Sequence, residues 1–144
     1  MREQIELTFK IGFPIQMAGT DIITQFERRV ADAASLICGG CETAYSTGWW
    51  KDDGASHAQR FTGKLEAEAT LTIKVSCEIA KSQEAYRHIK NAIIVYARDG
   101  GVKTNWVHVQ RVPFIGMHFS VEDAYLSAVE VRDVVSPGTR FAHS

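Results

Sequence analysis

The chain repeats one plan twice: a strand, a helix, a pair of glycines and a second strand. The first copy spans residues 5–50 and the second residues 65–112, and Gly39-Gly40 and Gly100-Gly101 follow the two helices. Because glycine adopts the left-handed backbone that ends many helices at little cost, each pair marks the point where a helix stops. This doubled β-α-β pattern constrains the fold far more than it constrains the chemistry.

The strands are recognised by the alternation of apolar and polar residues. Residues 65–77 alternate most regularly and residues 5–13 nearly as well, which indicates two strands with one buried face each. Residues 41–50 and 102–112 are expected to be the remaining strands. The order β-α-β-β-α-β predicts an α+β fold of the ferredoxin-like, split β-α-β type, with a four-stranded antiparallel sheet and two helices on one face. In that fold the first and third strands lie in the middle of the sheet, and the two most regular alternations belong to them.

The length fits one domain. With 144 residues, 45% of them hydrophobic, the chain can bury one substantial core. We predict a single domain, residues 1–144, with a core over 4–112 and a C-terminal extension over 113–144. Within the extension, residues 120–135 fit either a helix opened by Ser120 or extended chain, and we expect this segment to cover part of the sheet.

The charges of the chain almost cancel. Sixteen basic and seventeen acidic residues give a formal charge of -1, so no overall field attracts the protein to nucleic acid or to an anionic membrane. The first residues, MREQIELTFK, lack the apolar stretch of a signal peptide, and three cysteines cannot all pair with one another. These features predict a cytoplasmic protein, in the host cell cytoplasm if the chain is viral, with no membrane or nucleic-acid partner.

The strand expected over 102–112 carries one group of candidate ligand-binding residues. If Val107 and Val109 face the core, the period of two places four other side chains on the face without helices: Thr104, Trp106, His108 and Gln110. An exposed tryptophan among hydrogen-bonding groups can stack a base or a sugar ring. It can also form the centre of a homodimer, or become ordinary core if the C-terminal segment folds back over it.

A second group of candidates surrounds two adjacent tryptophans, Trp49 and Trp50. Neighbours on a strand point to opposite faces, so one of them is expected to anchor the core and the other to lie outside. Lys51 and Arg60, in or beside the loop that follows, are candidates for binding an anion. The plainer interpretation is a hairpin loop with ordinary solvated charges, although long loops often carry function.

No metal, cofactor or catalytic residue is predicted. Cys38 and Cys41 form a CxxC motif, but zinc needs two further ligands, and a redox CxxC normally opens a helix, whereas this one closes a helix. The phosphate-binding and nucleophile motifs GxGxxG, GxxxxGK[ST], GxSxG and HExxH do not occur. The alternative function is a small phosphodiesterase or hydrolase that uses His108 and His118, because His118-Phe119-Ser120 has the HxS form of two-histidine phosphoesterases.

Three features of residues 5–78 resemble a group of small uncharacterised proteins encoded by bacteriophages. They are the helix that ends at Gly39-Gly40, the run Gly48-Trp49-Trp50, and the turn Asp53-Gly54 before a strand. Cys41-Glu42-Thr43 stands where these proteins have an aromatic residue followed by threonine. The resemblance implies a ferredoxin-like scaffold and a viral accessory role in which the protein blocks or sequesters a host defence factor or its nucleotide signal.

These observations together predict a non-enzymatic binding protein. We expect a homo-oligomer, a dimer or larger, that holds a host protein or a small nucleotide-like ligand on the open face of the sheet and the adjoining edge loop. A purely structural assembly subunit is the third hypothesis, and it predicts a large oligomer without a bound small molecule.

Overall fold

The computed structural model describes residues 2–51, 63–104 and 106–135. Two compact units are present: residues 2–115 form the first, and the second begins at Gly116. The first unit contains the sheet and its two helices, and the described part of the second, up to residue 135, contains one helix. The candidate anion-binding residue Arg60 and the expected turn Asp53-Gly54 lie outside the described residues.

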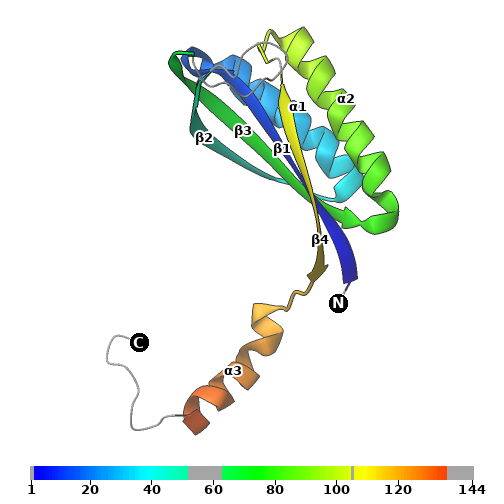
Figure 1. Cartoon of the computed structure of the whole chain (residues 1–144). Helices are drawn as coiled ribbons and strands as arrows, with labels where there is room; N and C mark the ends of the chain where they lie inside the picture. Colours follow the sequence, from blue (N-terminus) through cyan, green and yellow to red (C-terminus); the bar gives the residue numbers. More distant parts are fainter. Residues whose placement is uncertain (1, 52–62, 105, 136–144) are drawn as a thin grey trace. The chain divides into compact units, whose positions relative to one another are not determined.

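The first unit is the predicted α+β fold. Its elements follow one another as β1 (Arg2–Pro14), α1 (Asp21–Cys38), β2 (Glu42–Lys51), β3 (Leu65–Glu78), α2 (Ser82–Gly100) and β4 (Val107–Gly116), with short 3-10 turns η1 (Ile15–Met17) and η3 (Ile79–Lys81). The four antiparallel strands lie in the order β2-β3-β1-β4, so β1 and β3 are central and β2 and β4 are the edges. Both helices lie against the same face of this sheet (Figure 1). The predicted topology is therefore confirmed.

The core lies between the sheet and the helices. Odd-numbered residues of the two central strands face it in register, so that Leu7 lies opposite Val75 and Phe9 opposite Ile73. The helices contribute apolar stripes at helical spacing. The largest side chains that are completely buried are Phe9, Phe13, Leu7, Ile11, Ile23, Leu71, Ile73, Ile89 and Ile93. Burial of these groups, at about 1.5–3 kcal/mol each, supplies most of the driving force for folding.

Both helices end at the glycines that the sequence indicated. Gly39 follows α1 with φ of 79°, and Gly101 follows α2 with φ of 76°. The Gly39 N–H donates to the carbonyl of Ser35 at 2.9 Å, and the Val102 N–H donates to that of Ala97 at 2.8 Å. A side chain at position 39 or 101 would strain this left-handed backbone, so each glycine sets the direction in which the chain returns to the sheet.

The last strand differs from the predicted range of residues 102–112 at both ends. Val102 is buried and completes the end of α2, because its N–H bonds to the last turn of that helix, and regular pairing starts only at Val107. At the other end the strand continues through Pro113 to Gly116. An edge strand tolerates proline, because one side of its backbone has no partner strand. Thr104 and Trp106 therefore precede the strand instead of belonging to it.

The second unit contains α3, Val121–Val135. Its start agrees with the helical alternative for this segment: the Asp123 N–H donates to the Ser120 hydroxyl at 3.2 Å, and Glu122 and Asp123 lie in the first turn. The alternative of extended chain is wrong here. That this segment covers part of the sheet stays a prediction. Among the described residues no helix is both long and apolar enough to cross a membrane.

Candidate ligand site on the open sheet face

The face of the sheet that points away from α1 and α2 is called the open face below. It carries the even-numbered residues of the paired strands, and their register places Gly48 opposite Glu68, Trp50 opposite Glu66, and Gly12 opposite Thr70. Most of these side chains are partly or fully exposed, as expected. Thr8 differs, since only 7% of it is exposed. It lies directly opposite Lys74, and long charged side chains often cover their neighbours with their aliphatic stems.

Glu68 has glycines on both neighbouring strands. A Cβ atom built on Gly12 would overlap Oε1 of Glu68, so the carboxylate lies directly over the bare backbone of β1. On the other side Gly48 of β2 faces Glu68 across the strand pair. Partial burial raises the pKa of the Glu68 carboxyl above its ordinary value, because desolvation disfavours the charged form. The carboxylate is thus held close to the sheet instead of extending into water.

Trp50 lies over the second of these glycines. A Cβ atom on Gly48 would stand 2.7 Å from Nε1 and 3.2 Å from Cζ2 of Trp50, so the indole covers the Gly48 backbone. The ring remains 60% exposed. Glu66 is directly opposite Trp50, and residues in such a pair have Cβ atoms about 5 Å apart. The result is an accessible aromatic surface on β2, with Glu66 directly opposite it, while the Glu68 carboxylate lies across β3 over Gly12.

The edge strand β4 presents the other candidates. Val107 and Val109 pack against the core, whereas His108 and Gln110 are exposed on the opposite side, so the expected alternation holds within the strand. Trp106 is 72% exposed but lies just before the strand. The Thr104 hydroxyl donates to the Trp106 carbonyl at 3.4 Å, which ties the segment before the strand together.

The structure does not bring all predicted site residues together. β2 and β4 are opposite edges, so Trp50 and His108 are separated by two strands, or about 14 Å across the sheet. Trp49 and Lys51 are odd-numbered and lie on the helix side of β2. The expectation that one tryptophan anchors the core is wrong, because Trp49 is 64% exposed. The helix α1 reaches β2 beside Thr43 and Tyr45, and Trp49 lies further along the strand.

Sequence reasoning missed the roles of Gly12, Gly48 and Glu68. A glycine inside a strand often marks close approach of another group, so positions 12 and 48 carried a usable signal. The sequence carries no such signal for Glu68, because it occupies an outward-facing position in the strand, where a solvated charged residue is ordinary.

A cleft of about 310 Å³ lies on the helix side, between the N-terminal half of α1 and β2. At its wall Glu27 accepts hydrogen bonds from Thr43 at 2.5 Å and from Tyr45 at 2.6 Å. Burial, followed by the hydrogen bond to Glu27, raises the pKa of Tyr45 above its usual range. The Tyr45 ring meets Phe13 edge-on, with centroids 6.5 Å apart. These contacts tie the edge strand to the helix layer.

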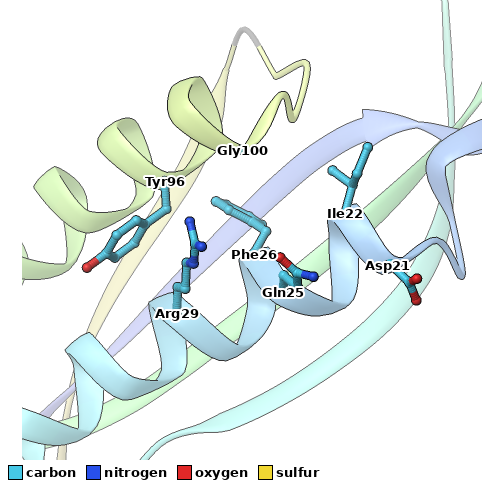
Figure 2. A pocket seen from close by; sticks show the side chains of 7 residues that line it. All are labelled: Asp21, Ile22, Gln25, Phe26, Arg29, Tyr96 and Gly100. Carbon is cyan, nitrogen blue, oxygen red and sulfur yellow. The ribbon is translucent and has the colours of Figure 1, made fainter.

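A smaller pocket lies between the two helices (Figure 2). Arg29 lies over the Tyr96 ring, 5.9 Å from its centroid, and buried Phe26 forms part of the lining. The space is about 110 Å³, well below the roughly 300 Å³ at which small-molecule sites begin. We interpret it as a packing feature of the helix pair.

Cys38 and Cys77 are poorly suited to redox chemistry. Burial, with a further contribution from neighbouring Cys77, raises the pKa of Cys38 to about 11, and burial also raises the pKa of Cys77. Thiols of this kind stay protonated at neutral pH and react slowly. Within the described ranges, no group of three or more His, Cys, Asp or Glu side chains is placed to hold a metal ion. The alternative catalytic pair is not assembled within one unit, because His118 belongs to the unit that begins at Gly116.

Comparison with known proteins returns only distant likenesses to solved structures. No model of a known protein family matches the chain, and no curated protein has a similar sequence. Among solved structures, the NIF3-related protein of Bacillus cereus is 12% identical with a TM-score of 0.47; the match covers 81% of this chain but only 27% of that protein, so the chain spans about a quarter of its length.

Two further structures are matched over nearly their whole length. The CutA divalent cation tolerance protein of Archaeoglobus fulgidus is 9% identical, with a TM-score of 0.45, and the match covers 85% of this chain and 96% of that one. A phage SAM lyase in complex with S-methyl-5'-thioadenosine is 14% identical, with a TM-score of 0.46 and coverage of 81% and 93%. These likenesses concern the course of the backbone alone.

Proposed function

We propose that this protein is a non-enzymatic binding protein that holds a small nucleotide-like ligand on the open face of its sheet. The observation that carries the proposal is the Trp50 indole, which lies over Gly48 beside Glu68 and remains mostly exposed. A flat, accessible indole stacks planar rings at little entropic cost, because its side chain has only two torsion angles to fix.

The biological role follows from the resemblance to bacteriophage accessory proteins. A protein of that kind acts on its host by sequestering a nucleotide signal or by blocking a host defence factor. The small-ligand role agrees better with the open face, where polar side chains of the strands surround the exposed Trp50 indole. Capture of a host protein is the other outcome that the experiment below distinguishes.

The protein is also proposed to form a homo-oligomer. β2 is a ten-residue edge strand that contains no proline, and its only charged residues, Glu42 and Lys51, are at its ends. Natural sheets usually protect such long, neutral edges, because the unpaired backbone groups recruit other strands. Pairing of this edge with another copy of the chain would satisfy those groups.

Native mass spectrometry of the freshly purified protein tests both statements together. We expect assembly masses that are multiples of the 16.0 kDa chain, plus the additional mass of a small molecule that is lost on denaturation. Trp50→Ala and Trp106→Ala should reduce the carried-over ligand, and Trp49→Ala, on the helix side, should not. If the first two variants are folded and retain the full amount, the open face is not the binding surface. A copurified protein in place of a small molecule would favour the host-protein role.

A further inference from the structure

We propose that the open face recognises a planar heterocycle that bears an exocyclic amino group, such as an aminopurine. In this site Trp50 stacks the ring and Glu68 accepts a hydrogen bond from the amino group. The inference rests on the proposed function, because it takes the open face as the ligand surface, and it adds the identity of the ring and the residue that selects it.

The geometry provides one place for a flat ring beside a hydrogen-bond acceptor. The indole of Trp50 covers Gly48, and the Glu68 carboxylate covers Gly12 two strands away from β2. Gly48 and Glu68 are directly opposite each other, so the indole and the carboxylate share one stretch of the sheet. The carboxylate extends from β3 toward β1, so only a ring that stacks on the exposed side of the indole and reaches across β3 brings its far edge toward Glu68. No side chain at position 12 or 48 obstructs that approach.

The charged residues around Trp50 determine which substituents on a bound ring are favoured. Glu66 is directly opposite Trp50, Glu68 is opposite Gly48 on the same face, and Lys51 extends from the other face of the strand. Carboxylates accept hydrogen bonds and repel anions, so this end of the face favours an amino or cationic edge and disfavours a phosphate or an oxo group at the same position. Two lysines of the open face, Lys10 and Lys74, lie further along β1 and β3, which leaves them available to an anionic tail of the ligand.

The environment of Glu68 makes this recognition sensitive to pH. Desolvation raises the pKa of its carboxyl, so the free site binds a proton more readily than an ordinary glutamate does. An amino group that donates to the carboxylate favours the charged form. Affinity should therefore be high above the pKa of Glu68 and should fall as the pH is lowered through it.

Calorimetric titration with two nucleosides provides the test. Adenosine carries the exocyclic amino group, and inosine has an oxo group at the same ring position. We expect adenosine to bind about tenfold more tightly than inosine, because the second ligand loses a hydrogen bond to a charged group and places an acceptor beside it. Trp50→Ala should lower the affinity for both nucleosides about tenfold or more. Trp49 is about equally exposed but lies on the other face, so Trp49→Ala should leave both affinities unchanged.

The Glu68→Gln variant separates selection of the ring from binding in general. Its amide can donate as well as accept, so the preference for adenosine over inosine should largely disappear while stacking on Trp50 remains. Equal affinity of the wild type for the two nucleosides, absence of measurable adenosine binding, or an unchanged preference in Glu68→Gln would each overturn the inference. If native mass spectrometry still finds a ligand that Trp50→Ala and Trp106→Ala release, the proposed function survives those results.

Discussion

The Glu68 carboxylate lies over Gly12, in the space that any larger residue at position 12 would occupy. The two residues are on neighbouring central strands and on the same face of the sheet. The glycine lets a charged group rest against the backbone and would thereby form part of the proposed binding surface. The same relationship between Gly48 and Trp50 on the adjacent strand extends this surface to the sheet edge.

Gly12→Ala should change the site without unfolding the protein. The new methyl group displaces only the end of a flexible side chain, so we expect the free energy of unfolding to stay within about 1 kcal/mol of the wild type. The displaced carboxylate becomes better solvated, so the pKa of Glu68 should fall toward its ordinary value. A carbon-detected NMR titration of the glutamate carboxyl groups measures this shift.

Gly40→Ala is the matched control for that experiment, since a Cβ atom there meets nothing within 4 Å. It should leave the Glu68 titration unchanged. An unchanged pKa in Gly12→Ala as well would contradict the role assigned to Gly12.

Glu68→Gln should stabilise the protein at neutral pH. The folded state raises the pKa of Glu68, so the charged carboxylate is less favourable in the folded than in the unfolded chain. The wild type should thus be most stable below the unfolded-state pKa and lose stability as the pH rises through the folded-state pKa. Urea unfolding at several pH values should show the variant more stable than the wild type at pH 7, with the difference vanishing in acid. A difference that grows in acid would have the wrong sign.

Tyr45→Phe should weaken the connection between β2 and α1. It removes the hydroxyl that donates to Glu27, and we expect a loss of about 1 kcal/mol because the pair is partly solvated. A double-mutant cycle with Glu27→Ala isolates the interaction. If the effects of the two single variants simply add, Tyr45 and Glu27 are not coupled.

Cys38 should be nearly inert in the native protein. Its pKa of about 11 leaves little thiolate at neutral pH, so alkylation by iodoacetamide should be much slower than in the urea-unfolded chain. Mass spectrometry of digested samples gives the rate for each cysteine. Rapid native labelling of Cys38 would show that its thiol is more exposed than the structure indicates.

The topology could be predicted from the sequence. Alternation of apolar and polar residues indicates the buried face of each central strand, and a glycine indicates the end of each helix. The sequence was insufficient for the site. A period of two assigns a residue to a face but does not tell which residues of separate strands are opposite, and Glu68 gains its role only from its neighbours Gly12 and Gly48. The start of β4 was also misplaced, since Val102 fits a strand pattern but is held by the last turn of α2.

The most direct test of ligand binding on the open face is an NMR titration of the isotope-labelled protein with adenosine. We predict that the shifts concentrate at the indole N–H of Trp50 and at the amides of Gly12, Gly48 and Glu68. Shifts confined to the helix side of β2, at Tyr45 and the Trp49 indole, would contradict the account.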